Sequence, residues 1–327
     1  EAGINCVQIP DKVHHLLKHL WTMFKIFKQG KYDVVHCHLD WFMNSYVCFL
    51  AMLAGVKKRI AHHHQAYTAQ EPVEGPKTRL VSLPNHLVKN FLCSLFRIPC
   101  KLFATHWLAC GEAAAINGWG KSAVKKGKVT ILPNAIDPER FKFCETARRE
   151  IRAKYGIAED DFVVGHVGRF YPQKNHEFLI DVFAELRKQR ANAKLLLLGD
   201  GPLQDHIKQK VESLSLAKTV IFAGLQKDIA PFYSAMDVFC FPSLWEGLPL
   251  TLVEAQYAEL PCFVSENVTK ETIVNDNVCL LPNDDVKSWC KRLDVLNVAN
   301  NRNRSQIKDN RFDIKANYGM LEQIYVQ

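Results

Sequence analysis

Two glutamates stand eight positions apart in the stretch LWEGLPLTLVEAQ. Glu246 lies just ahead of Gly-Leu-Pro, and Glu254 lies about one turn into a helix that Pro249 is well placed to begin. A carboxylate can accept hydrogen bonds from the two hydroxyls of a vicinal diol, such as those of a ribose or a hexose. The backbone N–H groups of Gly247–Leu250 can hold an anion at the helix start. The spacing predicts an anion site flanked by two carboxylates; an ordinary surface helix is the alternative for this stretch read alone.

Two cations flank a turn in a second phrase, GHVGRFYPQKN. Arg169 and Lys174 follow a predicted strand and precede a helix that is expected to start near Asn175. Two cations beside the positive end of a helix dipole are suited to a diphosphate. Two solvated surface charges are the alternative interpretation of this phrase on its own.

A third phrase, LLLLGDGPL, carries two glycines after a strand. Gly199 and Gly201 allow a tight strand-to-helix turn in which a ligand can approach the backbone. The phrase is not the G-x-G-x-x-G fingerprint of dinucleotide sites, and no acidic residue follows at the spacing which that motif requires.

The second half of the chain alternates between apolar strands and helices, which explains why the three phrases should meet. The predicted strands are FVVGHVGRF, AKLLLLGDG, TVIFAG, DVFCFPS and PCFVSE, and the helices between them are HEFLIDVFAELRKQR, LQDHIKQKVESL, DIAPFYSAM and LTLVEAQYA. Apolar strands without alternation indicate a parallel sheet that is covered on both faces. The pattern predicts a doubly wound, Rossmann-like α/β domain with its ligand site at the carboxyl ends of the strands.

The first half shows the same rhythm less clearly. A helix over 11–29, a strand over 32–38, a helix over 44–55 and a strand over 58–65 predict a βαβ arrangement. Residues 66–78 read as a loop, and a composition shift near 143 marks a domain boundary. We therefore predict a first domain over 1–143, a second domain over 144–310, and a C-terminal helix over 311–327 that packs back toward the first domain.

Composition limits the class of protein. The 327 residues exceed what one core usually needs, and no apolar run reaches the roughly 20 residues that span a bilayer. The 11 cysteines show no C-x-x-C pair, so free thiols in a reducing compartment are expected. The sequence predicts a cytoplasmic protein that is able to lie on the inner face of the plasma membrane.

The net charge is +8, and the excess of Lys and Arg lies in the first 135 residues. Such a half favours an anionic partner, either phosphates or a lipid surface. The basic, apolar stretch 83–105 is compatible with an interfacial helix at a membrane, and equally with an ordinary domain helix. Nucleic acid is not expected as a partner, because the lysines are spread out without interleaved aromatic residues.

The phrases GRFYPQKN, LGDGP, PSLWEGLPLTLVEA and LPNAIDPERF, considered together, resemble retaining glycosyltransferases of family 4, which have the GT-B fold. The resemblance covers nearly all of the chain. The segment YDVVHCHLDWFMNSYVCFLAMLAGVKKRIAHHH is similar to bacterial enzymes of capsule and exopolysaccharide synthesis. The resemblance implies an α/β protein with two Rossmann-like domains facing across a cleft, an acceptor-side domain over 1–143 and a donor-binding domain over 144–310. The family's first strand and Gly-rich loop have no counterpart here, so we expect the first βα unit to be missing.

The resemblance also assigns roles. It places Arg169 and Lys174 on the donor diphosphate, Glu254 on the ribose hydroxyls, and Glu246 and His64 at the donor sugar, with the register among His62, His63 and His64 left open. The implied catalytic set is His64, Glu246, Arg169 and Lys174. The implied donor site comprises Gly168, Arg169, Lys174, Gly199, Gly201, Glu246, Gly247, Leu248, Pro249, Leu250, Glu254 and Asn134.

We expect no cofactor other than the donor substrate, which the resemblance suggests is a UDP-sugar, and a lipid-linked or oligosaccharide acceptor. No metal site is expected, because D-x-D is absent and consecutive histidines on a strand point to opposite faces. Glu259 stands where the family often has Gly at a helix end, which should cost some stability. The alternatives are a catalytically inactive GT-B partner subunit and a GT-B nucleotide-sugar epimerase. A phosphorylase would need a pyridoxal-type Lys motif that is missing.

Overall fold

The computed structural model describes residues 4–39, 41–64, 98–296, 307 and 309–326. The chain divides into two compact units, of which the first is Glu1–Pro133 with Met320–Gln327 and the second is Asn134–Gly319. The predicted loop 66–78 and most of the stretch 83–105 lie outside the described residues.

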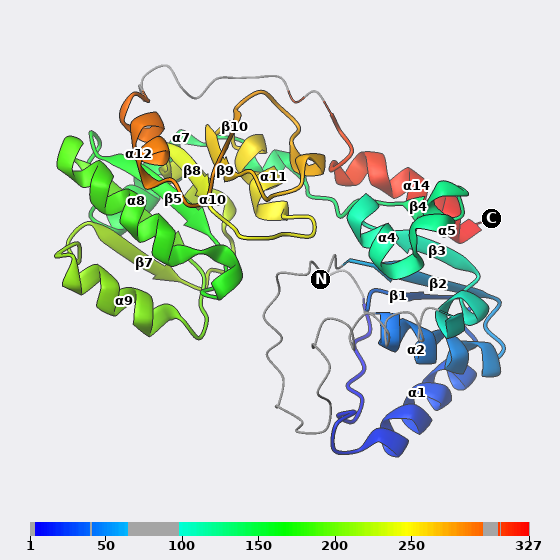
Figure 1. Cartoon of the computed structure of the whole chain (residues 1–327). Helices are drawn as coiled ribbons and strands as arrows, with labels where there is room; N and C mark the ends of the chain where they lie inside the picture. The colour runs from blue at the N-terminus through cyan, green and yellow to red at the C-terminus, as the bar shows by residue number, and fades with distance from the viewer. Residues whose placement is uncertain (1–3, 40, 65–97, 297–306, 308, 327) are drawn as a thin grey trace, which may run out of the picture. The chain divides into compact units, whose positions relative to one another are not determined.

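The first unit is built on a parallel four-stranded sheet in the order β1-β2-β3-β4 (Figure 1). Its described elements are α1 (Leu16–Gly30), β1 (Val34–Cys37), α2 (Trp41–Leu53), β2 (Lys58–His63), β3 (His106–Ala109), α4 (Glu112–Trp119), α5 (Lys121–Lys125), β4 (Thr130–Ile131) and the end of α14 (Ile314–Val326). The predicted βαβ pattern is therefore present. Helix α1 begins later than expected, because the Asp11 carboxylate accepts hydrogen bonds from the backbone of Val13 and His14 and forms a turn there.

The second unit has a six-stranded parallel sheet in the order β10-β9-β8-β5-β6-β7. Its elements are α6 (Pro138–Phe141), α7 (Glu145–Lys154), β5 (Phe162–Val167), η1 (Pro172–Lys174), α8 (His176–Gln189), β6 (Ala193–Leu198), α9 (Gln204–Ser213), β7 (Val220–Gly224), α10 (Ala230–Ala235), β8 (Val238–Phe241), α11 (Leu250–Tyr257), β9 (Cys262–Ser265), η2 (Lys270–Thr272), β10 (Val278–Leu281), α12 (Val286–Asp294) and the start of α14. The strand order reverses between β5 and β8, and such switch points form ligand crevices at the carboxyl ends of the strands.

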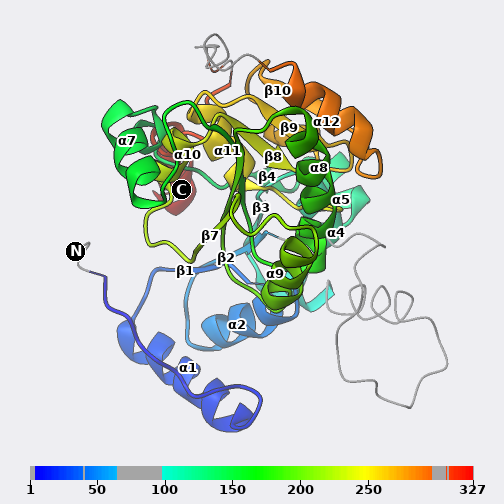
Figure 2. The same cartoon turned by 90° about the vertical axis from the view of Figure 1, so that its left-hand side faces the viewer.

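Both faces of this sheet are covered by helices, as the apolar strands predict. Helices α7, α10 and α11 lie on one face, and α8, α9 and α12 lie on the other (Figure 2). Successive strand residues enter opposite cores: Val163 packs with the first set of helices and Val164 with the second. Strand β10 and helix α12 were absent from the prediction, as were the short helical segments α6, η1 and η2.

The division between the units comes earlier than the predicted boundary near 143. Residues 134–141 belong to the second unit because Ile136 and Phe141 are buried in its core. At the other end, Phe312 is also buried in that core, and its carbonyl accepts a hydrogen bond from the Ile136 backbone. The chain joins the first unit from Met320 onward rather than from 311.

Helix α11 ends in a Schellman motif with a strained residue. Glu259 has φ of +60°, its N–H donates to the Gln256 carbonyl, and the Leu260 N–H donates to the Ala255 carbonyl. A side chain at positive φ costs roughly 1 kcal/mol, which glycine avoids. We expect Glu259→Gly to raise the free energy of unfolding by about 0.5–1 kcal/mol in urea denaturation. Glu259→Ala keeps the Cβ and should gain little; a lower stability of the glycine variant would contradict this account.

Candidate active site

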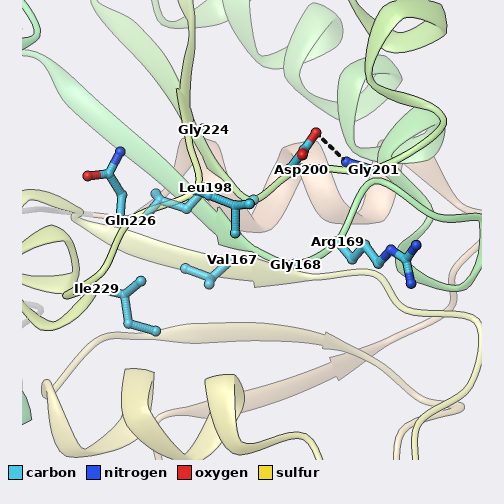
Figure 3. A pocket seen from close by; sticks show the side chains of 11 residues that line it. Val167, Gly168, Arg169, Leu198, Asp200, Gly201, Gly224, Gln226 and Ile229 are labelled. Atoms are coloured by element: carbon cyan, nitrogen blue, oxygen red, sulfur yellow. Dashed lines mark hydrogen bonds between the residues drawn. The ribbon is translucent and has the colours of Figure 1, made fainter. Parts of the chain in front are cut away.

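The carboxyl ends of β5, β6 and β7 enclose a pocket of about 430 Å³ (Figure 3). Its lining includes Gly168, Arg169, Gly199, Gly201, Gln226 and Ile229. Two of the three predicted phrases therefore meet at this edge of the sheet. Gln226 and Ile229, which follow β7, were not predicted as part of the site, because their stretch of sequence carries no chemical signature.

The two glycines after β6 are required by a close approach of backbone to backbone. Gly199 and Gly201 have φ of +132° and +159°, and a Cβ on them would lie 2.1 Å from the Gly168 carbonyl oxygen and 2.5 Å from the Phe170 carbonyl oxygen respectively. The Phe170 N–H also donates to the Asp200 carbonyl at 3.0 Å. The expected tight turn is confirmed, and what it brings near the backbone is the neighbouring loop after β5.

A buried ion pair joins the first phrase, LWEGLPLTLVEAQ, to the second, GHVGRFYPQKN. The ammonium of Lys174, at the end of η1, lies 2.6 Å from the Glu246 carboxylate, with the two side chains only 15% and 7% exposed. Gln173 donates to the other oxygen of Glu246 at 3.2 Å and to the Trp245 carbonyl at 2.9 Å. The Leu244 N–H donates back to the Gln173 carbonyl. The loop after β8 is therefore fastened to the turn after β5, and Lys174 and Glu246 lie together rather than apart.

Arg169 differs from Lys174 in its surroundings. Its side chain is exposed, its guanidinium lies 5.4 Å from the centre of the Tyr171 ring, and it extends along the pocket wall (Figure 3). Within the described ranges, Arg169 forms no ion pair with an acidic side chain. One site therefore offers a neutralised, buried cation and an exposed one.

Gly168 is constrained by two buried side chains behind it. A Cβ there would lie 2.8 Å from Nε2 of His166 and 3.1 Å from Cδ of Lys174. His166 is fully buried, and its Nδ1–H donates to the Cys240 carbonyl at 2.8 Å. Burial lowers the pKa of His166 to about 4, and the Cys240 contact opposes that shift. Both His166 and its ring neighbour His176 stay neutral behind Lys174, since burial also lowers the pKa of His176 to about 2.

Glu254 lies on the buried face of α11. It is 9% exposed, and the hydroxyl of Tyr233 on α10 donates to its Oε2 at 2.7 Å. Burial raises the pKa of Glu254, while the Tyr233 hydrogen bond and the charge of Arg140 oppose the rise. Sequence reasoning missed Tyr233, because an aromatic residue on a short apolar helix is typical of a core position. It holds one carboxylate oxygen in place and leaves the other as an acceptor.

The remaining residues of the first phrase form the start of α11. Pro249 is the N-cap residue and Leu250 is the first helical residue, one position later than the sequence suggested. The preceding residues Gly247 and Leu248 form the loop into the helix, and the Leu252 N–H donates to the Pro249 carbonyl at 3.2 Å. The anion site itself stays a prediction.

His64 and Asn134 belong to different units, in the first and at the start of the second respectively. Of the three consecutive histidines, His63 packs edge-on against Trp119 at 4.9 Å between ring centres. His62 and His64 lie on the other face of β2, with ring centres 4.1 Å apart. The register that the sequence left open is thus limited to His62 and His64, since His63 points into the core.

The two parallel-sheet α/β units define a GT-B fold, the fold of a large class of glycosyltransferases. The chain belongs to the glycosyl transferases group 1 family, whose model matches residues 147–311, and residues 4–140 match the model of glycosyltransferase family 4.

Individual relatives agree with this assignment. The chain is 33% identical to the putative glycosyltransferase EpsF of Bacillus subtilis (strain 168) over 92% of this chain and 76% of EpsF. It is 28% identical to the UDP-Gal:alpha-D-GlcNAc-diphosphoundecaprenol alpha-1,3-galactosyltransferase of Escherichia coli over 95% of this chain and 79% of that protein. The crystal structure of Anabaena Alr3699/HepE in complex with UDP-glucose shares the fold, with a TM-score of 0.73 at 18% identity over 96% of this chain and 84% of that one. Across the described residues, no helix is long and apolar enough to cross a membrane.

Proposed function

We propose that this protein is a retaining, metal-independent glycosyltransferase that moves a hexose from a UDP-sugar to a lipid-linked or oligosaccharide acceptor in surface polysaccharide synthesis. The observation that carries the proposal is the buried Lys174–Glu246 pair beside exposed Arg169, at the carboxyl edge of the second sheet. The galactosyltransferase named above supports a UDP-sugar donor and an acceptor on a diphosphoundecaprenol lipid.

Glycosyl transfer requires cations at the place where the leaving diphosphate develops negative charge. The acceptor oxygen bonds to the anomeric carbon while the bond from that carbon to the diphosphate oxygen breaks. The released nucleoside diphosphate carries the electron pair, and the acceptor hydroxyl loses its proton to solvent or to that diphosphate. Arg169, Lys174 and the N–H groups at the start of α11 stabilise the growing negative charge. These groups supply the charge that a divalent metal supplies in other transferases.

Glu254 is assigned to the nucleotide end of the donor. A fixed carboxylate accepts hydrogen bonds from a vicinal diol, and the Tyr233 contact fixes it before the donor arrives. The pocket of about 430 Å³ beside Gly199 and Gly201 suits the rest of the nucleoside. Glu246 then faces the sugar, held in place by Lys174 and Gln173.

A membrane-bound acceptor would be met at the inner face of the plasma membrane. The positive excess in the first 135 residues favours attraction to anionic lipid headgroups, which would bring the enzyme to a lipid-linked acceptor. Vesicle co-sedimentation, with and without anionic lipid, tests this part of the proposal separately from catalysis.

Glu254→Ala is expected to weaken UDP binding by about 10- to 100-fold, because hydrogen bonds to a charged group contribute roughly 1.5–3 kcal/mol. Isothermal titration of UDP into the full chain measures the change. The matched control is Glu212→Ala, which removes an exposed glutamate from α9 and should leave UDP affinity unchanged. Equal UDP affinity in the Glu254 variant and the unchanged protein would refute the role assigned to Glu254.

Activity itself is tested by UDP release across a panel of nucleotide sugars with lipid-linked and oligosaccharide acceptors. NMR of the product establishes whether the anomeric configuration is kept. UDP binding without turnover would indicate a catalytically inactive partner subunit. Conversion of the nucleotide sugar without an acceptor would indicate an epimerase instead.

A further inference from the structure

Four histidines gather on one face of the first unit's sheet. His36 and His38 extend from β1, and His62 and His64 from the neighbouring strand β2. His36 is paired with Ile60 in the parallel register, so alternate residues of both strands face the same side. The expectation of no metal site took account only of the consecutive histidines His62, His63 and His64 at the end of β2. Two H-x-H patterns on adjacent strands place their four rings on one face of the sheet. Consecutive residues of one strand would point their rings to opposite faces.

The rings are close enough to share one ion. One nitrogen from each of His36, His38 and His62 lies within 4.8 Å of the other two. Tetrahedral zinc with bonds of 2.0–2.1 Å has ligand nitrogens about 3.3 Å apart, so the three must approach one another by up to about 1.5 Å. Rotation about the broad χ2 torsion of histidine moves a ring nitrogen by that amount.

The buried nitrogens lack the partners that a neutral structural role would provide. His62 is 3% exposed; within the described ranges neither of its ring nitrogens meets hydrogen-bond geometry, and its one polar neighbour of note is the Leu132 backbone. Nε2 of His36 is also buried without a partner. A buried polar atom without a partner destabilises the folded state, and metal coordination would remove that penalty.

The second ring nitrogen of His36 and of His38 is held by a hydrogen bond, as is usual for histidines that bind a metal. Nδ1 of His36 lies 2.8 Å from the Tyr325 hydroxyl, which leaves Nε2 facing the cluster. Nδ1 of His38 lies 2.9 Å from Nε2 of His64, which leaves Nε2 of His38 free to coordinate. A ligating imidazole usually has its second nitrogen held in this way.

The donor set selects the kind of ion. The described cluster offers imidazole nitrogens as ligand atoms, and these suit transition metals such as zinc, copper and nickel. Magnesium and calcium require oxygen ligands, and the described cluster offers only nitrogen.

We propose that His36, His38 and His62 form a binding site for a transition-metal ion of the Zn²⁺ type in the first unit, with water or His64 completing the coordination. Tyr325 acts from outside the ligand set by holding His36 in orientation. The site is separate from the residues assigned to the donor diphosphate, which all belong to the second unit.

The test is equilibrium dialysis of the EDTA-stripped full chain against ZnCl₂, with bound metal quantified by mass spectrometry. We expect one zinc per chain, and a rise in melting temperature on zinc addition. Loss of a residue that only hydrogen-bonds to a metal ligand typically weakens metal binding by about 10- to 100-fold. Tyr325→Phe should therefore weaken zinc binding by about 10-fold. His62→Ala removes a ligand and should weaken zinc binding by more than that range. His38→Ala is the companion variant, because this side chain is exposed and its removal should leave the fold intact by circular dichroism.

The matched control is His106→Asn, which removes a histidine from β3 of the same sheet but from outside the cluster. It should bind zinc like the unchanged protein. The proposal is overturned if the stripped chain takes up no zinc. It is equally overturned if the His38 and His62 variants bind zinc as tightly as the control.

Discussion

Lys174→Ala is expected to lower kcat for sugar transfer by about 10²- to 10³-fold, the range for losing one preorganised charge-stabilising group. The ammonium lies in a nearly dry position, 2.6 Å from Glu246 and 4.7 Å from the centre of the Phe241 ring. Charges in such surroundings act more strongly than charges in water. Its removal deprives the leaving diphosphate of a cation and also leaves Glu246 buried with Gln173 as its remaining partner.

The measurement is UDP release under saturating donor, with UDP affinity followed separately by isothermal titration. Lys188→Ala is the control, because Lys188 forms an exposed ion pair with Glu185 on α8 and should tolerate removal. A kcat within about twofold of the unchanged enzyme would show that Lys174 does not act on the transition state.

A double-mutant cycle separates the two effects of Lys174. If Lys174 acts only by positioning Glu246, then Lys174→Ala should add nothing in a protein that already carries Glu246→Gln. If it also stabilises the leaving group, a large further loss of kcat remains in the double variant. We expect the second result, because the Lys174 side chain also packs against Gly168 on the wall of the pocket.

The fold was predictable because its signals are local. Apolar runs such as residues 162–167 and 193–198 are long, fully or nearly fully buried, and separated by amphipathic helices. Strand β10 escaped prediction because it has four residues, lies at the sheet edge and is mostly half-buried. Short edge strands carry little periodicity for a pattern to detect.

The candidate site was predictable only in part. Residues that follow strands could be expected at the same edge, which placed Arg169, Lys174 and Glu246 near one another. The pairing of Lys174 with Glu246 could not be derived, since it joins positions 72 residues apart. Tyr233 and His166 were missed for a related reason, because each acts through a neighbour that is remote in sequence.

The boundary between the units shows the same limit. The composition shift near 143 reflects the start of the charged helix α7, which is a surface feature. The division between the units instead depends on which core buries Ile136 and Phe141. Local composition does not reveal burial against residues that are distant in sequence. Sequence patterns therefore predict helices and strands well, but they predict poorly which segments pack against one another.

Asp237→Ala is expected to reduce the free energy of unfolding by about 3–5 kcal/mol, the cost of breaking a buried ion pair from one side. The carboxylate is 4% exposed and accepts hydrogen bonds of 2.7 Å from Arg148, Arg152 and the Val163 N–H. The alanine variant leaves two poorly solvated guanidinium groups and one strand N–H without this partner. The melting temperature should fall by about 6–20 °C for a unit of this size.

Thermal unfolding by circular dichroism measures the loss. The matched control is Glu145→Ala, which breaks the exposed Arg149–Glu145 pair on the same helix, α7. Exposed pairs at this spacing contribute at most about 0.5 kcal/mol, so this variant should melt within a few degrees of the unchanged protein. Similar melting temperatures for the Asp237 and Glu145 variants would show that the buried pair contributes little.

A triple variant, Arg148→Met, Arg152→Met and Asp237→Leu, separates the cost of leaving a buried charge unpaired from the contribution of the ionic group as a whole. Replacing a whole buried ionic group with apolar residues is often neutral or stabilising, because no charge is left unpaired. We therefore expect the triple variant to lose less than Asp237→Ala alone. Arg152 also donates to the Ala158, Glu159 and Asp161 carbonyls, which connect α7 to β5, so some loss should remain. The loss of stability that remains in the triple variant would measure how far the two arginines position the start of β5, the strand that leads to Gly168 and Arg169.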